Sequence, residues 1–201
     1  MRKDFVYLAS ASPRRRELLE QLGVPFEVRA AHVDEARLAG EEAGTYVLRV
    51  ALAKAEAVCG MLHGEEAAGA VLAADTAVAI DGEVLGKPGE EPEALAMLAR
   101  LSGRTHRVYT GVALRIGLEA QQALSISDVT FRATSEAERR AYCATGEPYD
   151  KAGGYGIQGR GAAFVEYLRG SYSTVMGLPL FETAELLRRV GLPAWLRSEG
   201  N

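Results

Sequence analysis

The first candidate for chemistry is an aspartate in an otherwise apolar stretch of the sequence. Asp75 is the only charged residue between Ala67 and Ile80. Burying an unpaired carboxylate costs several kcal/mol, so this group must be paired, bind a metal or face a cleft. Such carboxylates often mark functional sites. A β-bulge that turns Asp75 outward, or a capping role, would also explain it.

A lysine interrupts the apolar face of a predicted helix. Val47, Ala51, Lys54 and Val58 follow the i, i+4, i+7, i+11 spacing of one helical stripe. One interpretation is a boundary lysine whose ammonium reaches water along an apolar surface. The other is an ammonium directed at an anion in a cleft.

Three arginines occupy the first turn of a predicted helix, where cations oppose the helix dipole. We interpret Arg16 as part of a solvated face. The misfit of Arg14 with the dipole suggests another partner. Together with the hydroxyls of Ser10 and Ser12 and the free N–H groups of the turn, Arg14 would form an anion pocket that suits phosphate.

Further polar residues stand in predicted loops. Lys87 is held extended by Pro88, and the adjacent acids Asp34 and Glu35 could direct one carboxylate at a metal. Each of these residues also fits an ordinary exposed position. Gln158 is the one amide within the glycine-rich segment 153–161, where it could hydrogen-bond a base edge or the loop backbone.

Several well-known sites are not supported by the sequence. The glycine-rich segment contains no GxGxxG placed after a strand and before a helix, and no GxxxxGK[ST]. Its glycine density indicates backbone that approaches another group closely or needs positive φ. GxSxG is absent, and the three histidines lack the spacing of zinc ligands.

Strands and helices must position these residues. They alternate in the early part of the chain, whereas later strands follow one another as hairpins. Ser12 is predicted to cap a helix that begins at Pro13 and stops before Gly23. Strands are predicted at Phe5–Ser10, Val24–Arg29, Ala70–Ile80, Thr105–Ile116, Gln121–Arg132 and Ala162–Tyr167. Further helices are predicted from Glu41 or Thr45 to about Leu62, over Pro92–Leu101, from the Ser135 capping box to about Thr145, and from Pro179 to Gly191. This order indicates an α/β fold with a mixed sheet.

Composition sets limits on the function. The 201 residues fit one large or two-lobed domain, and apolar and charged contents of 48% and 25% are typical of globular proteins. A net charge of −4 disfavours nucleic-acid binding. The apolar stretches are too short to cross a membrane, and Phe5–Ala9 is too short for a secretion signal. With Cys59 and Cys143 far apart in sequence, we expect a cytoplasmic protein.

Taken together, the motifs resemble the Maf family of nucleoside triphosphate pyrophosphatases. The similarity runs in order over about residues 5–190, so we expect one Maf-like domain over residues 1–201. Its motifs are Leu8-Ala-Ser-Ala-Ser-Pro-Arg-Arg15, Ala74-Asp-Thr76, Gly86-Lys-Pro88, Leu101-Ser-Gly103, Asp150-Lys-Ala-Gly-Gly-Tyr-Gly-Ile-Gln-Gly159 and Val175-Met-Gly-Leu-Pro179.

The resemblance implies an inosine-triphosphatase-like fold with two lobes around a cleft, often dimeric. It also implies hydrolysis of nucleoside triphosphates to the monophosphate and pyrophosphate with a divalent metal. Asp75 falls on the family's proposed proton acceptor. The family's polar cleft positions are Ser10, Arg14, Glu35, Lys54 and Lys87 in this sequence. Arg14, Thr76 and Gln158 fall on positions that mark the branch acting on dTTP and UTP.

These expectations combine into one mechanism. A triphosphate carries roughly four negative charges, which Arg14, Lys54, Lys87 and a metal would neutralise. We expect Asp75 and Glu35 to hold Mg²⁺ or Mn²⁺ and Asp75 to activate the attacking water. A base role and a metal-ligand role for Asp75 stay open, and Asp34 could replace Glu35 after a one-residue shift.

Two alternative functions also stay open. One is a house-cleaning hydrolase for modified pyrimidine nucleotides. The other is a nucleotide-binding regulator of cell division, or septum formation, with little turnover. The expected partner is a nucleotide, with a homodimer as a possible assembly and neither nucleic acid nor membrane.

Overall fold

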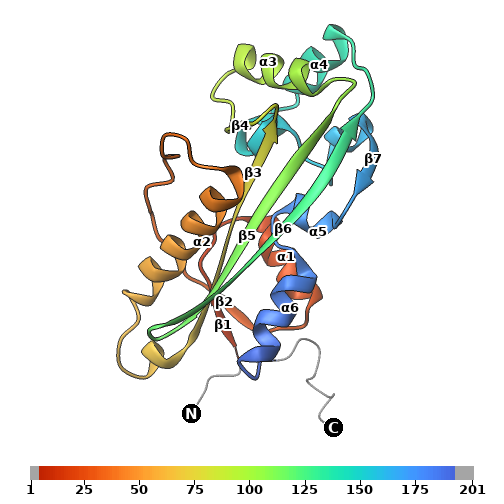
Figure 1. Ribbon diagram of the computed structural model, residues 1–201. Helices are drawn as coiled ribbons and strands as arrows, with labels where there is room; N and C mark the ends of the chain where they lie inside the picture. Colours follow the sequence, from red (N-terminus) through yellow and green to blue (C-terminus); the bar gives the residue numbers. More distant parts are fainter. Residues whose placement is uncertain (1–4, 193–201) are drawn as a thin grey trace. The chain divides into compact units, whose positions relative to one another are not determined.

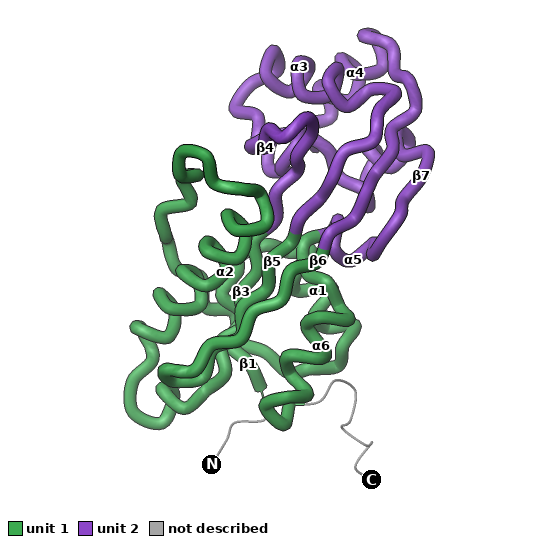
Figure 2. Tube along the Cα trace, in the orientation of Figure 1, with its two compact units in different colours: residues 1–75, 110–125, 177–201 green, residues 76–109, 126–176 purple. Residues whose placement is uncertain are grey.

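The computed structural model describes residues 5–192 as two compact units (Figure 2). Unit 1 consists of residues 1–75, 110–125 and 177–201, and unit 2 of residues 76–109 and 126–176. The terminal residues 1–4 and 193–201, which belong to the predicted 1–201 domain, lie outside the described part of the chain. The chain thus forms the two lobes that were expected, while the cleft between them stays a prediction.

In the described part of the chain, seven strands form one sheet in the order β2-β1-β3-β5-β6-β7, with β4 paired to β3. β1 is parallel to both β2 and β3, whereas β3–β4 and β6–β7 are antiparallel. The predicted mixed α/β sheet is therefore confirmed. The strands are β1 (Val6–Leu8), β2 (Phe26–Val28), β3 (Ala70–Ile80), β4 (Glu83–Leu85), β5 (Thr105–Ile116), β6 (Glu119–Phe131) and β7 (Val165–Arg169).

The helices flank this sheet (Figure 1). The α-helices are α1 (Pro13–Gln21), α2 (Ala43–Cys59), α3 (Glu91–Leu101), α4 (Glu136–Cys143), α5 (Tyr172–Met176) and α6 (Leu180–Arg189). Within residues 5–192 four 3₁₀ helices accompany them: η1 (Gly64–Ala68), η2 (Glu147–Asp150), η3 (Ala152–Gly154) and η4 (Arg160–Phe164). In the described chain, none of the helices has the length and apolar character needed to cross a bilayer.

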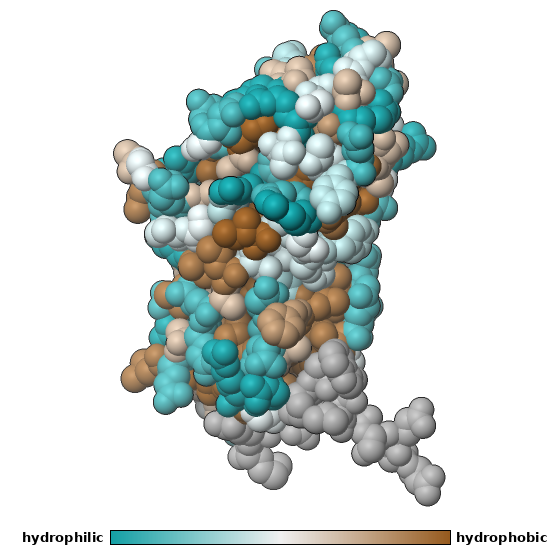
Figure 3. Space-filling model, turned by 45° about the vertical axis from the view of Figure 1, so that its right-hand side comes forward, coloured by the Kyte–Doolittle hydropathy of each residue, from teal (hydrophilic) through white to brown (hydrophobic). Residues whose placement is uncertain are grey.

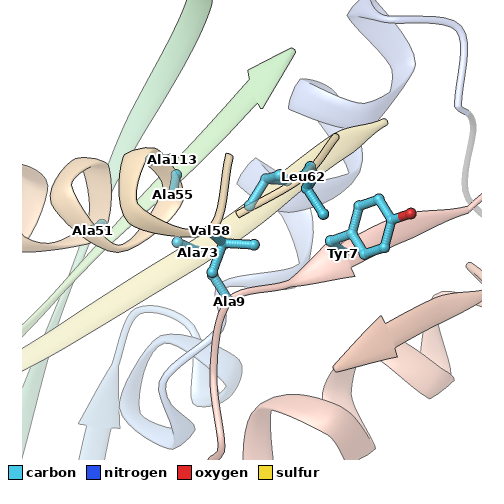
Figure 4. Close-up of a cluster of buried hydrophobic side chains, with 9 residues drawn as sticks. Tyr7, Ala9, Ala51, Ala55, Val58, Leu62, Ala73 and Ala113 are labelled. Atoms are coloured by element: carbon cyan, nitrogen blue, oxygen red, sulfur yellow. The ribbon is translucent and has the colours of Figure 1, made fainter. Parts of the chain in front are cut away.

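The core of unit 1 is built on the alternation of side chains along its strands. Tyr7 and Ala9 of the first strand region, and Val71 and Ala73 of β3, belong to one buried cluster with α2 (Figure 4). Because successive strand residues point to opposite faces, Val6, Leu8 and Leu72 face away from α2. These three side chains are also fully buried, and α1 and α6 lie on that side in Figure 1.

Unit 2 contains the β3–β4 hairpin and helices α3 and α4. The hairpin turns at Asp81 and Gly82, both with positive φ, as a two-residue type I′ turn requires. The capping box at the start of α4 is confirmed, since the Ser135 side chain accepts from the Glu138 N–H and the Glu138 carboxylate accepts from the Ser135 N–H. His106 and Tyr155 are buried beside Phe131 in the core of this unit.

Apolar and polar side chains are interspersed on the face shown in Figure 3. The most exposed large apolar side chains are Leu118, which is 94% exposed, and Phe181, which is 75% exposed. Leu118 follows Gly117 in the loop joining β5 to β6, so its exposure results from its place at a hairpin tip.

Candidate active site

Asp75 lies inside unit 1, paired with a lysine of α2. It is 6% exposed, and the alternation of β3 places it on the same face as Ala73, toward α2. The Lys54 ammonium lies 2.8 Å from Asp75 Oδ1. A bulge that turns Asp75 outward is therefore the wrong interpretation. The charge is buried because a cation from the neighbouring helix meets it.

The same ammonium contacts a second carboxylate. Lys54 Nζ lies 2.8 Å from Glu35 Oε1 as well as 2.8 Å from Asp75 Oδ1, and its side chain is only 12% exposed. The boundary-lysine interpretation is therefore wrong, because the charged end is held by two acids instead of reaching water. One cation thus brings two carboxylates from distant parts of the sequence together.

The adjacent acids Asp34 and Glu35 have different partners in the structure. Asp34 Oδ1 accepts the Ala36 N–H at 2.8 Å in a local turn. Glu35, whose side chain is 44% exposed, is the one that reaches Lys54. Of the two acids weighed from the sequence, Glu35 lies beside the Asp75 pair.

The loop that carries Glu35 is fastened to α2 by residues that sequence reasoning missed. The Tyr46 hydroxyl donates to the Glu35 carbonyl at 3.0 Å, and Arg49 donates to the Ala36 carbonyl at 3.0 Å. Arg49 also makes two hydrogen bonds, of 2.7 and 2.8 Å, to the Glu41 carboxylate. Three α2 side chains, those of Tyr46, Arg49 and Lys54, therefore fix the loop.

The surroundings of Tyr46 keep its phenol protonated. Burial, followed by the negative charges of Asp75 and Glu35, raises the pKa of Tyr46 to about 12. The phenol is thus a hydrogen-bond donor throughout the neutral range. The signal for this residue was available in principle, because Tyr46 lies eight residues before Lys54 on the same helix.

At the start of α1, Arg15 contacts Ser10. Arg15 Nη1 donates to the buried Ser10 Oγ at 3.3 Å, and Arg15 Nε donates to the Gly177 carbonyl at 2.8 Å. Burial lowers the pKa of Arg15, and the charge of Asp75 opposes this shift. The guanidinium therefore belongs to the same electrostatic environment as the paired carboxylates.

The misfit with the helix dipole pointed to Arg14, whereas the structure brings Arg15 to Ser10. The missed signal is that Arg15 precedes Leu18 and Leu19 by three and four residues, which places it on the buried stripe of α1. Arg14 is half-buried, and its positive charge further lowers the pKa of Arg15. Its role in binding stays a prediction.

The predicted cap at Ser12 differs from the structure. Ser12 occupies the N-cap position of α1, but its side chain makes no capping hydrogen bond. Instead its backbone N–H donates to Ser10 Oγ at 3.2 Å. Ser10 thus accepts both from this N–H and from Arg15, which orders the turn around one buried hydroxyl.

The remaining predicted site residues belong to unit 2. Thr76 follows Asp75 in β3 and is half-buried, whereas Lys87 and Gln158 are exposed. The loop of Lys87 is attached to the glycine-rich segment, because the Gly153 N–H donates to the Gly86 carbonyl at 2.9 Å. Unit 2 therefore joins the segments that carry Lys87 and Gln158.

Glu35 and Asp75 are the acids that could hold a metal. Within residues 5–192 no group of three or more His, Cys, Asp or Glu side chains is arranged to bind one. A pair of carboxylates suits Mg²⁺ when the oxygens of a phosphate substrate and water complete its octahedron. In the structure one oxygen of each carboxylate contacts the Lys54 ammonium, and the metal stays a prediction.

A family model and several named relatives match almost the whole chain. A family model described as "Maf-like protein" matches residues 5–190. A protein of Aromatoleum aromaticum named "dTTP/UTP pyrophosphatase" is 53% identical over 198 residues, covering 94% of this chain and 96% of that protein. One of Methylococcus capsulatus with the same name is 55% identical over 185 residues, covering 92% and 90%. The solved structure of the Staphylococcus aureus Ham1 protein aligns with a TM-score of 0.44 and 14% identity over 63% of this chain and 71% of that one.

Proposed function

Because this chain belongs to the Maf family, we propose that it hydrolyses dTTP and UTP to the monophosphate and pyrophosphate. The observation that carries the proposal is the buried Asp75–Lys54 pair with Glu35 on the same ammonium. The names of the relatives support the choice of substrate.

In the proposed reaction, a water molecule attacks the α-phosphorus of the nucleotide. Asp75 accepts the proton of the attacking water, and the new bond forms between the water oxygen and phosphorus. The bond from the α-phosphorus to its bridging oxygen breaks, and pyrophosphate leaves with the bonding electrons. Little else is needed from the protein beyond positioning and charge stabilisation.

Cations of the site would bind the polyphosphate. Lys54 is held in place by two carboxylates, so its ammonium is ordered before the substrate arrives. Arg15 and the Ser10 hydroxyl would contribute donors at the start of α1. We propose further phosphate contacts from Arg14 and Lys87, and base contacts from Thr76 and Gln158.

Glu35 and Asp75 are the residues that would hold Mg²⁺ or Mn²⁺. When bound, such a cation supplies charge neutralisation on the phosphate oxygens and lowers the pKa of bound water. Asp75 has a second carboxylate oxygen besides the one that contacts Lys54. It could therefore take part both in metal binding and in proton transfer.

The test combines product analysis with a matched pair of variants. The wild-type protein should release pyrophosphate, and not orthophosphate, from dTTP and UTP. Asp75→Asn should lower kcat by about two orders of magnitude or more while the fold stays intact, because general-base catalysis contributes about 10²–10⁴-fold. Asp34→Asn, which alters an acid outside the lysine pair, is the control. A near-normal rate for Asp75→Asn would remove Asp75 from the mechanism.

A substrate panel separates this proposal from the house-cleaning alternative. Uracil and thymine differ by one methyl group, worth only about 1–3 kcal/mol of discrimination, so one site can accept both nucleotides. A kcat/KM for modified pyrimidine triphosphates far above that for dTTP would make the modified nucleotides the preferred substrates.

We further propose that the protein acts in the cytoplasm as a homodimer. Cys59 and Cys143 are both free thiols, which suits a reducing compartment. The molar mass in solution, measured by light scattering after size-exclusion chromatography, tests the dimer. A monomer mass at micromolar concentration would contradict it.

A further inference from the structure

Gln158 is presented on a tight turn of the glycine-rich segment. The Gly159 N–H donates to the Gly156 carbonyl at 3.2 Å, so the segment from Gly156 to Gly159 forms a four-residue turn. Within it Ile157 is buried and Gln158 is exposed. The amide of Gln158 thus extends from a turn whose other central side chain is fixed in the protein.

Both ends of this turn are tied to one pair of side chains. Before the turn, the Gly156 N–H donates to Tyr142 Oη at 3.1 Å. After it, the Arg160 N–H donates to Glu147 Oε2 at 2.8 Å and the Gly161 N–H to Glu147 Oε1 at 3.1 Å. The two anchors are joined, because the Tyr142 hydroxyl donates to Glu147 Oε1 at 2.8 Å.

This arrangement explains two glycines of the segment, Gly159 and Gly161. A Cβ atom at Gly159 would lie 2.5 Å from the Glu147 carboxylate, and one at Gly161 would lie 2.8 Å from Tyr142 Oη. The close approach indicated by the glycine density is therefore made to the protein's own anchoring side chains. The backbone N–H groups of this part of the segment already bind a carboxylate, as they would in an anion-binding nest.

The ionisation of the pair agrees with this geometry. Burial opposes the charge of Glu147, yet the N–H groups of Arg160 and Gly161 and the Tyr142 hydroxyl leave its pKa below the ordinary value. Burial raises the pKa of Tyr142, with the hydrogen bond to Glu147 as the next cause. At neutral pH the carboxylate accepts and the phenol donates.

We propose that Glu147 and Tyr142 are positioning residues for base recognition, because they fix the turn from which Gln158 reads the pyrimidine edge. This inference rests on the proposed function, in which Gln158 hydrogen-bonds uracil or thymine. Neither anchor needs to touch the substrate. Their contribution is to hold the turn in place before the nucleotide binds. Binding then loses no entropy to ordering the turn, and the selectivity for the base is preserved.

The first test is a double-mutant cycle on nucleotide selectivity, measured as the ratio of kcat/KM for dTTP to that for dCTP. In Glu147→Gln, either orientation of the new amide sets an NH₂ group against an N–H or O–H donor. The selectivity ratio should fall about tenfold, since small displacements of binding groups have effects of this size or larger. Gln158→Ala should lower the ratio in the same way, and the double variant should lose no more than Gln158→Ala alone.

Glu138→Gln is the matched control. Glu138 is also a carboxylate of unit 2 that accepts a backbone N–H, that of Ser135, but it caps α4 instead of holding the turn. This control should keep the selectivity of the wild type. Fully additive losses in the Glu147/Gln158 cycle, or unchanged selectivity in Glu147→Gln, would overturn the inference.

A second variant separates positioning from general destabilisation. Tyr142→Phe keeps the ring that packs edge-on against Phe164 at 5.1 Å and removes only the hydroxyl. Amide hydrogen exchange should become faster over residues 156–161 while the melting temperature stays close to that of the wild type. Unchanged exchange in this segment would count against the anchors. A wild-type protein that did not prefer dTTP over dCTP would instead count against the proposed function, whatever the exchange rates showed.

Discussion

At Lys54, one ammonium group serves two carboxylates, and this gives the residue a structural role as well as a binding role. Asp75 is 6% exposed and would lose its cation if the lysine were shortened. Breaking such a buried pair typically costs about 3–5 kcal/mol, mainly because the remaining charge is left uncompensated. The stability and the activity of the protein are therefore coupled at this residue.

Lys54→Ala should lower the melting temperature and also weaken nucleotide binding, seen as a higher KM. Lys87→Ala is the comparison, because Lys87 is exposed and should affect KM with little change in melting temperature. Thermal unfolding and steady-state kinetics of both variants provide the measurement. A Lys54→Ala protein that is more stable than the wild type and equally active would contradict the buried-pair account.

His106 is a titratable residue that the proposed reaction does not use. Its Nε2 lies 2.8 Å from Tyr155 Oη, and its Nδ1 is buried with no hydrogen-bond partner among the described residues. Burial lowers the pKa of His106 to about 4. The folded protein therefore holds this imidazole neutral at pH values where an unfolded chain would protonate it.

This shift predicts a loss of stability in acid. Because the pKa is about 4 in the folded state and about 6.5 in the unfolded chain, the unfolded state binds more protons below pH 6.5. The stability contribution is complete above that pH and falls as the pH decreases toward 4, by about 2 kcal/mol at pH 5. Urea unfolding at pH 7.5 and 5 measures it. His106→Gln should show a smaller loss over this interval, and an equal loss would contradict the role of His106.

At the scale of elements, α2 connects the core of unit 1 to the chemistry of the site. Its apolar side chains Ala51, Ala55 and Val58 are buried against the strands, while Tyr46, Arg49 and Lys54 fix the loop of Glu35. The helix lies close to β5 because residue 111 is a glycine. A Cβ atom there would be 2.8 Å from the carbonyl of Val47.

Gly111→Ala should therefore displace α2 from β5. Overpacking against a backbone typically costs about 1–3 kcal/mol, and the displacement of Lys54 should also lower kcat/KM. Gly60→Ala at the end of α2 is the control, because its Cβ would meet only ordinary contacts at 3.5 and 3.6 Å. Thermal unfolding and kinetics check both variants. Equal behaviour of the two alanines would show that the close approach at Gly111 has no consequence.

Helices and strands with a clear apolar pattern, or with a clear capping or turn signal, could be predicted from the sequence. The bounds of β3 and β5 match the predictions, and the capping box at Ser135 and the hairpin at Asp81-Gly82 are confirmed. The three residues of β4 and the five of α5 were missed because such short segments have no measurable period. The predicted strand at Val24–Arg29 is shorter in the structure, where β2 covers Phe26–Val28.

Only part of the site could be predicted, because only some of its residues interrupt an apolar pattern. Asp75 interrupts an apolar strand and Lys54 an apolar helix face, so both could be singled out from the sequence. The structure shows that they form an ion pair. Arg15 stands between two other arginines, and its place on the buried stripe of α1 is the signal that distinguishes it. Arg49, Tyr142 and Glu147 break no pattern, and each binds backbone atoms of loops that sequence periodicity does not describe.

For the molecule as a whole, the net charge of −4 opposes the binding of a polyphosphate. Local cations must therefore overcome this charge, and Lys54 is already shared by two acids. A divalent cation at Glu35 and Asp75 would change this balance, because it would neutralise the acids and attract phosphate at once. Substrate affinity should consequently depend strongly on metal.

EDTA should abolish turnover, and added Mg²⁺ or Mn²⁺ should restore it. A non-hydrolysable dTTP analogue should raise the melting temperature in the presence of metal, by the mass-action effect of a ligand that binds only the folded state. After chelation the rise should be much smaller. Thermal shifts with and without EDTA provide the measurement, and full activity in EDTA would refute the metal requirement.

The division of the chain into two units has a practical consequence for recombination between relatives. The boundaries between the units fall at 75/76, 109/110, 125/126 and 176/177. Unit 1 therefore consists of three separate stretches of sequence and unit 2 of two. The first three boundaries lie within β3, β5 and β6. A single genetic crossover at any of these three boundaries would therefore splice foreign sequence into the middle of a strand. A chimera that takes unit 2 from a homologue needs two inserts, and the three seams that fall within strands must be matched residue for residue in the hydrogen-bonding register.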